Sequence, residues 1–310
     1  TAANPYILAM GPSQTATQRL NLAQSFNPIG LIGGLLIAQQ FVLKNLKSDD
    51  IENYSALDEA SKTLIRTSDL LIIRNPYVIL GLVIAVVFFV FFLSKMPQSK
   101  DDGQLPSVKE TIKVLAKNSN YFLGLISQIF HVGCLIMCWT FIYQYAEVIG
   151  IDSAAAGNYQ LTAFVLFVLG RALGTYLLRF ISAGKQLFYY SLLGIIFLLG
   201  VVFIQGIIGL YCLVAVSFCL SVKFPTIYGI ALGDLSEEEA KIGSAGLIMA
   251  IVGGATLPKL QAKIIDLGGS GVSDTLLLGV SETNFSFIIP LLCFTFIAWF
   301  GFHVYKKQNC

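Results

Sequence analysis

Charged residues are scarce in this chain of 310 residues. Lys, Arg, Asp and Glu make up 12% of it, whereas roughly a quarter of the residues in a soluble domain are charged. Hydrophobic residues make up 55%, and the mean hydropathy is +0.74. This composition excludes a soluble globular protein and predicts an integral membrane protein. The net charge is only +2, and the basic residues do not form one continuous stripe, which excludes nucleic acid as a partner.

Signatures of metal sites and enzymes are also missing. Five of the six cysteines, at positions 134, 138, 212, 219 and 293, lie within apolar runs and lack the paired spacing of zinc ligands. We expect these cysteines to pack, and we expect neither a metal nor another cofactor. The sequence shows no cluster of His, Asp and Glu, no nucleophile motif and no phosphate loop. The prediction is therefore a protein that is not an enzyme.

Long apolar runs recur along the whole chain. Each is long enough for a helical crossing of the bilayer, which takes about 20 residues. The pattern predicts an all-α membrane protein with eight crossings and a short stub at residues 1–10. The predicted crossings are residues 17–44, 75–94, 121–147, 155–180, 187–204, 206–232, 242–264 and 284–305.

Lysine and arginine are distributed unevenly between the predicted loops. The C-terminus and the loops at 11–16, 95–120, 181–186 and 233–241 carry Lys and Arg within or beside them, whereas the loops at 148–154 and 265–283 contain neither. The positive-inside rule places the basic side in the cytoplasm, with the protein in the cell inner (plasma) membrane. One predicted loop does not follow this rule: residues 45–74, on the opposite side, contain Lys47, Lys62, Arg66 and Arg74.

Residues 95–120 form a long cytoplasmic loop in this scheme. Its segment 107–117 has helical periodicity, with Val108, Ile112 and Leu115 on one face and lysines at 109, 113 and 117 on another. This is typical of an interfacial amphipathic helix. The sequence thus predicts a remnant of an N-terminal transmembrane bundle at 1–94, with the end of one span and two full spans. A cytoplasmic linker at 95–120 and a C-terminal bundle of six spans at 121–310 follow.

Nine short motifs are distributed along the chain. They are Thr1-Ala-Ala-Asn-Pro5, Arg19-Leu-Asn-Leu-Ala-Gln-Ser-Phe-Asn27, Asn75-Pro-Tyr77, Cys138-Trp139, Asn158-Tyr159, Gly170-Arg-Ala-Leu-Gly174, Pro225-Thr-Ile227, Gly243-Ser244 and Gly253-Gly254. Through them the chain resembles the fucose permease family of the major facilitator superfamily, which performs sugar/proton symport. The resemblance implies a major facilitator fold, alternating access between two bundles, and a monosaccharide and a proton as partners. It also implies a missing N-terminal segment of the same protein, which would carry the proton-coupling acids.

Gln24 and Asn27 are polar residues within the first predicted span. Residues three apart on a helix share a face, so we expect both amides to point the same way. Unpaired amides are costly in lipid, which favours the bundle interior. There they would either contact a substrate or bond across helices. The resemblance places both on positions that hold the sugar in the central cavity.

Two aromatic residues also become candidate sugar contacts through the resemblance. Phe224 falls where the best-known fucose carrier pattern has a tyrosine, so the ring is kept and the hydroxyl is lost. The identity of the sugar, fucose or a related hexose, therefore stays open. Phe167 matches an aromatic lining position more weakly, and an aromatic in a span can equally well serve packing alone.

Three of the basic residues inside predicted spans call for comment. Lys223 calls for an explanation, because an ammonium near mid-bilayer costs roughly 2.5 to 3.5 kcal/mol on insertion scales. It could face an aqueous cavity and affect substrate or proton affinity, or snorkel, or meet a helix carbonyl. Arg171, between Gly170 and Gly174, is expected to have a structural or gating role. His131 is expected to be a hydrogen-bonded packing residue.

No Asp or Glu falls deep within a predicted span. Proton symport needs an intramembrane group that changes charge with the proton, usually a carboxylate. Two functions therefore stay open. The first is secondary active transport of a monosaccharide coupled to protons, with Gly30, Gly33, Gly34, Gly253 and Gly254 permitting the close helix contacts that rocking requires. The alternative is a non-transporting fragment of such a carrier that lacks the proton-coupling acids.

Overall fold

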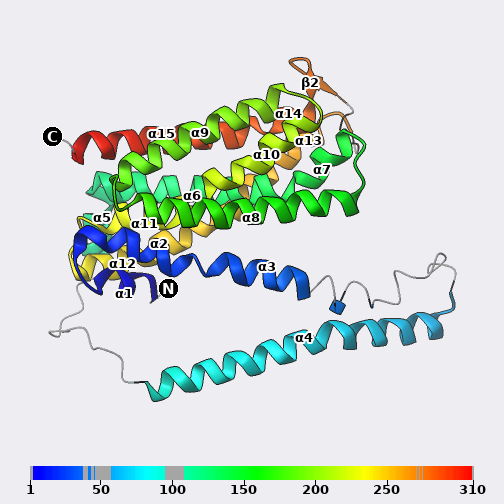
Figure 1. The fold of residues 1–310 in the computed structure, drawn as a ribbon, viewed down its shortest axis with the longest axis horizontal. Helices are drawn as coiled ribbons and strands as arrows, with labels where there is room; N and C mark the ends of the chain where they lie inside the picture. Colours follow the sequence, from blue (N-terminus) through cyan, green and yellow to red (C-terminus); the bar gives the residue numbers. More distant parts are fainter. Residues whose placement is uncertain are drawn as a thin grey trace. The chain divides into compact units, whose positions relative to one another are not determined.

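The computed structural model describes residues 3–37, 41–42, 45, 57–94, 108–269, 271, 273 and 275–308. These residues are mostly helical (Figure 1). Contacts divide the chain into two compact units, one made of Thr1–Pro28 with Leu105–Cys310 and the other of Ile29–Gln104. The division predicted from the sequence, at residues 94 and 120, remains a prediction.

The helices and strands of the described chain follow one another in a fixed order. Their bounds are α1 (Ala3–Ala9), η1 (Ser13–Thr15), α2 (Ala16–Gln24), α3 (Asn27–Ile37), α4 (Glu59–Leu93), α5 (Val108–Lys117), α6 (Ser119–Thr140), α7 (Ile142–Val148), α8 (Ser153–Leu177), α9 (Ala183–Phe203), α10 (Ile207–Leu220), α11 (Lys223–Leu232), α12 (Glu237–Met249), η5 (Ala250–Val252), α13 (Gly253–Ile265), β1 (Leu276–Leu277), β2 (Val280–Ser281), α14 (Glu282–Ser286) and α15 (Ile288–Gln308).

Seven helical segments of the described chain are long and apolar enough to cross a membrane. They are Glu59–Leu93, Ser119–Thr140, Ala155–Leu177, Ala183–Phe203, Ile207–Leu232, Glu238–Ile265 and Glu282–Lys307. Each corresponds to one of the eight predicted crossings, so the chain is a multi-pass, all-α membrane protein. The first prediction, 17–44, has no counterpart among these seven, and part of its end lies outside the described residues.

The segment predicted as one helix from residue 17 is broken at Ser25 and Phe26, which separate α2 from α3. Two local features explain the break. Pro28 has no N–H to donate to the carbonyl four residues earlier, and its ring disfavours an uninterrupted helix at that point. The Ser25 hydroxyl donates to the Asn21 carbonyl at 2.8 Å. The prediction of an unbroken helix here was therefore wrong.

The second predicted crossing begins much earlier than expected. Helix α4 starts at Glu59 rather than at residue 75 and continues through Pro76. The Asp58 carboxylate caps it by accepting a hydrogen bond from the Ser61 N–H at 3.3 Å. Hydrogen bonds from the Ser61 side chain and backbone hold the pKa of Asp58 below its ordinary value. The longer helix also brings Asp69, which the prediction had placed in a loop, inside a candidate span.

The helices of the larger unit pack around α6, α9 and α10. Helix α9 packs along α15, α10 against both α8 and α9, and α6 against α11, α13 and α15 (Figure 1). The largest core cluster has fully buried members from several of these helices, among them Met137, Leu198, Leu213 and Phe294. This packing fixes the positions of α8, α10 and α11, which carry most of the candidate site.

A helix, α5, occupies residues 108–117 of the segment predicted as an interfacial amphipathic helix. It packs against α6 and α12. Thr111 and Leu115 are its buried residues, whereas Val108 and Ile112 are exposed. Leu115 thus lies on the packed side, apart from the two apolar residues with which the sequence had grouped it.

Candidate functional site

Arg171 is the residue that joins the most elements of the candidate site. It lies on α8 with only 5% of its surface exposed. Its Nε donates to the Ser221 carbonyl at 2.6 Å, and its Nη1 donates to the Gln24 carbonyl at 2.9 Å. Ser221 lies in the break between α10 and α11, and Gln24 ends α2. One guanidinium therefore bonds to the ends of two interrupted helices.

Neither the Gln24 carbonyl nor the Ser221 carbonyl has the N–H donor that a continuous helix would supply, and the reason is the same for both. The residue four positions after Gln24 is Pro28, and the residue four positions after Ser221 is Pro225. Proline has no N–H, so neither carbonyl can receive the bond that an uninterrupted helix would supply. Carboxyl ends of helices also carry partial negative charge, which favours a cation there. Arg171 supplies both missing donors and the positive charge.

Small residues allow α8 to approach this break closely. A Cβ built on Gly170 would lie 2.6 Å from the Phe218 carbonyl oxygen and 2.7 Å from the Ser221 Oγ. The Tyr190 hydroxyl on α9 also donates to the Gly170 carbonyl, at 3.4 Å. The close helix packing predicted around Arg171 is therefore present.

Gln24 and Asn27 do not share one helix face as predicted, because the helix breaks between them. Gln24 is 9% exposed, and its Nε2 donates to Asn4 Oδ1 at 3.3 Å. Asn27 is exposed at the start of α3. Asn21, one turn before Gln24, donates through Nδ2 to Thr226 Oγ1 at 3.4 Å and so links α2 to α11. The amide of Gln24 thus lies beside the junction that Arg171 closes.

The two aromatic candidates have different neighbours. Phe167 is one turn before Arg171, whose guanidinium carbon lies 4.7 Å from the centre of the Phe167 ring. Trp139 packs edge-on against the same ring at 5.2 Å. Phe224, at the start of α11, is half-buried and stacks on Tyr228 with ring centres 6.2 Å apart. A ring in this position can pack on the apolar face of a pyranose.

Lys223 is fully buried rather than open to a cavity. Its Nζ lies 3.1 Å from the centre of the Phe294 ring on α15, and no hydrogen-bond partner of the Nζ is found within the described chain. A desolvated cation–π contact stabilises the ammonium by about 2 kcal/mol, whereas removing a charge from water costs several kcal/mol. The ring contact therefore offsets only part of the cost of burying a charge at Lys223.

His131 and Gln128 were not among the predicted binding residues, although both lie near this cluster. They are three apart on α6 and therefore on one face. Exposure is 1% for His131 and 0% for Gln128. In the part of the chain that the structure describes, His131 Nδ1 and both amide atoms of Gln128 have no partner. The His131 ring lies 6.4 Å from that of Phe224. The expected hydrogen bond of His131 is thus not found at Nδ1.

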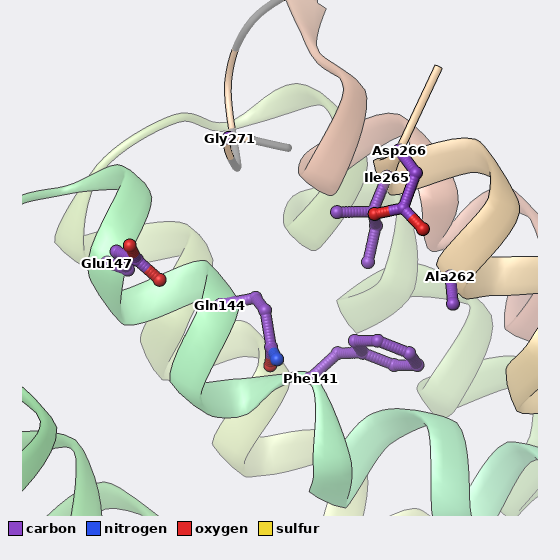
Figure 2. Close-up of a pocket in the computed structure, with 7 residues that line it drawn as sticks. All are labelled: Phe141, Gln144, Glu147, Ala262, Ile265, Asp266 and Gly271. Carbon is purple, nitrogen blue, oxygen red and sulfur yellow. The ribbon is translucent and has the colours of Figure 1, made fainter. Parts of the chain in front are cut away.

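A pocket lies elsewhere, between α7 and the end of α13 (Figure 2). Its volume is about 330 Å³, and Phe141, Gln144, Glu147, Ala262, Ile265, Asp266 and Gly271 line it. Glu147 and Gln144 approach it from α7 and Asp266 from the opposite side (Figure 2). None of the predicted sugar contacts lines this pocket, so it is distinct from the junction around Arg171.

The chain is similar in sequence to known transport proteins. No family model matches it. The L-fucose-proton symporter of Haemophilus influenzae is 48% identical over 313 residues, which cover 99% of this chain and 71% of that protein. The chain belongs to the fucose permease family. A second member, the L-fucose-proton symporter of Escherichia coli, is 28% identical over 315 residues, covering 100% of the chain and 68% of that protein. The glucose/galactose transporter of Brucella abortus is 28% identical over 303 residues, covering 97% and 66%.

Solved structures support the same fucose permease assignment and show the major facilitator fold. A crystal structure of the Escherichia coli fucose:proton symporter FucP matches with a TM-score of 0.85 and 27% identity, over 97% of this chain and 72% of that one. FucP in the outward conformation matches with a TM-score of 0.86 and 27% identity, over 97% and 71%.

Proposed function

We propose that this protein carries a monosaccharide across the membrane together with protons, and that L-fucose is its sugar. The observation that supports this most strongly is the 48% identity to an L-fucose-proton symporter along 99% of the chain. The relatives named for glucose and galactose are 28% identical or less. The alternative of a fragment without transport function is not favoured by these relatives.

The proposed sugar contacts are Gln24, Asn27, Phe224 and Phe167. An amide both donates and accepts, so Gln24 and Asn27 can bind vicinal hydroxyl groups without a charge. The rings of Phe224 and Phe167 would pack on the apolar face of the pyranose. Support for this comes from the buried position of Gln24 beside the junction and from the half-buried ring of Phe224.

Arg171 has a gating role in this proposal. Alternating access requires α2 to move against the helices of the C-terminal bundle, and the bond from Arg171 to Gln24 joins them. The bond to Ser221 lies within the bundle and would persist during such a movement. Sugar binding at Gln24 and the gate at Arg171 would then be coupled through one residue.

Uptake of radiolabelled L-fucose tests the proposed function. The protein is produced in bacterial cells without a fucose carrier of their own, and unlabelled L-fucose, D-galactose and D-glucose compete in parallel. We expect uptake that depends on a proton gradient and that L-fucose inhibits most strongly. Preferential inhibition by galactose or glucose would contradict the choice of sugar, and no uptake of any of the three would contradict the function. Fractionation should recover the protein in the inner membrane.

A further inference from the structure

Lys223 and His131 form a buried pair of bases beside a proposed sugar contact. Exposure is 0% for Lys223 and 1% for His131, and neither the Lys223 Nζ nor the His131 Nδ1 has a hydrogen-bond partner within the described residues. They lie on α11 and α6, two helices packed against each other. Phe224 connects them, because it follows Lys223 in the chain and its ring packs against that of His131.

Among the described residues, no carboxylate forms an ion pair with Lys223 or His131. Arg171 on α8 and Lys223 are the cations nearest in effect to His131. Around Lys223 are thiols from α6, α10 and α15, at Cys134, Cys138, Cys219 and Cys293. Other elements packed against α11 carry polar groups that already have hydrogen-bond partners. Arg19 on α2 donates to main-chain carbonyls, and the Tyr190 hydroxyl on α9 donates to the Gly170 carbonyl. The Glu239 carboxylate on α12 accepts from the Ser236 N–H.

Repulsion limits how many protons these two bases can hold. Arg171 is a permanent cation, and like charges at short range in a poorly solvated site disfavour further protonation. A proton on either Lys223 or His131 therefore disfavours a second proton on the other. The first proton has one favourable site in this arrangement, since the Lys223 Nζ lies over the face of the Phe294 ring.

We propose that Lys223 and His131 are a proton-binding site of this carrier, which takes up one proton from water on one side of the membrane and releases it on the other. The inference rests on the proposed function and deepens it, because it assigns a proton site to bases of the C-terminal bundle. Protonation of Lys223 adds charge at the Phe294 ring, and protonation of His131 adds charge on the ring that packs against Phe224. A sugar in contact with Phe224 would bind the two charge states with different affinity, which couples the two equilibria.

The pH dependence of sugar affinity tests this site. For the unchanged protein we expect the KM for L-fucose to rise with external pH, by up to about tenfold per pH unit where the pair loses its proton. Lys223→Met removes the amine while keeping an unbranched side chain. We expect it to flatten this dependence and to abolish accumulation, while exchange of labelled for unlabelled sugar persists. Lys185→Met is the matched control, because Lys185 also lies over a ring, Tyr305, at 5.9 Å.

A structural role of Lys223 would lower protein abundance without flattening the pH profile. His131→Asn provides the second variant, expected to shift the profile rather than abolish it. A Lys223→Met protein of normal abundance with the unchanged pH profile would overturn the inference. So would a His131→Asn protein whose profile matches that of the Lys185→Met control.

A direct titration separates this inference from the proposed function. The purified chain labelled with ¹⁵N-lysine is titrated between pH 5 and 10, with Lys223→Met identifying the Nζ signal. A signal that changes from ammonium to amine in that range supports the site even if no sugar is transported, in which case only the proposed function fails. An ammonium signal throughout, in a protein that transports sugar, overturns the inference alone.

Discussion

The Arg171 Nη1 donates to the main-chain oxygen of Gln24 at 2.9 Å, across 147 residues of sequence. The bond has a local cause at each end. Pro28 removes the donor that the Gln24 carbonyl would have in a continuous helix, and Gly170 lets α8 come close to the break after α10. Arg171 bonds in the same way to the carbonyl that Pro225 leaves free. Two prolines, a glycine and an arginine thus make one junction between three helices.

Replacing Arg171 should destabilise the junction more as more of its hydrogen-bond donors are removed. Arg171→Lys keeps the charge, but one ammonium cannot reproduce the planar fork that serves both carbonyls. Arg171→Gln also removes the charge. Each lost charge-assisted hydrogen bond is worth about 1.5 to 3 kcal/mol. We expect thermal unfolding in detergent to occur at lower temperature for Arg171→Lys and lower still for Arg171→Gln, with uptake reduced in the same order.

The control for this series is Arg179→Gln, since Arg179 is an exposed arginine just after the end of α8, with a ring contact to Tyr176 at 5.8 Å. It should unfold and transport as the unchanged protein does. Equal unfolding temperatures for Arg171→Gln and Arg179→Gln would show that the two carbonyls do not depend on Arg171.

Pro28→Ala separates stability from transport. Alanine restores an N–H for the Gln24 carbonyl and favours a continuous helix, where proline costs about 3 kcal/mol relative to alanine. The bond from Arg171 then has a competitor within the helix. We expect the unfolding temperature to stay or rise while the rate of sugar uptake falls. Uptake at the unchanged rate would mean that the break after α2 is not needed for transport.

Gln24→Ala tests the proposed sugar contact. It removes the side-chain amide but leaves the carbonyl that binds Arg171. Because a neutral hydrogen bond contributes about 0.5 to 1.5 kcal/mol, the KM for sugar should rise by up to about tenfold. Gln18→Ala on the same helix is the control and should leave KM unchanged. The same KM in both variants would remove Gln24 from the binding site, leaving only its bond to Asn4.

Phe224→Tyr restores the hydroxyl of the fucose carrier pattern. A new hydrogen bond to one sugar and not to another changes the preference between them by about fivefold, for roughly 1 kcal/mol. We therefore expect the ratio of fucose to galactose uptake to change, whereas Phe224→Leu should weaken both. Phe122→Tyr, at an exposed ring, should do neither. Identical sugar preference in Phe224→Tyr and the unchanged protein would speak against contact at this ring.

Hydropathy was sufficient to predict seven of the crossings, because lipid requires long apolar helices whatever their packing. It could not predict that α4 begins at Glu59. The charged residues between 59 and 74 suggested a loop, while the Asp58 cap and the helical hydrogen bonds carry the helix through them. Hydropathy also does not register a break such as Ser25–Phe26, where the apolar character continues but the hydrogen bonding changes.

The candidate site was predictable in its residue types but not in its contacts. Gly170 beside Arg171 indicated close packing, and this was correct. The bonds of Arg171 to Gln24 and Ser221 depend on residues 147 and 50 positions away, which periodicity cannot relate. The signal that would have found them is the pair of prolines, each four residues after a carbonyl that needs a donor. Gln128 and His131 carried a weaker signal, as two polar residues on one face of an apolar helix.

Sugar-induced alkalinisation tests the central claim most directly. L-fucose is added to an unbuffered, anaerobic suspension of cells that produce the protein, and the external pH is recorded. Proton-coupled uptake predicts an immediate rise in pH, with a smaller or absent rise for Lys223→Met and an unchanged rise for Lys185→Met. A steady pH in cells that nevertheless accumulate labelled fucose would contradict proton coupling.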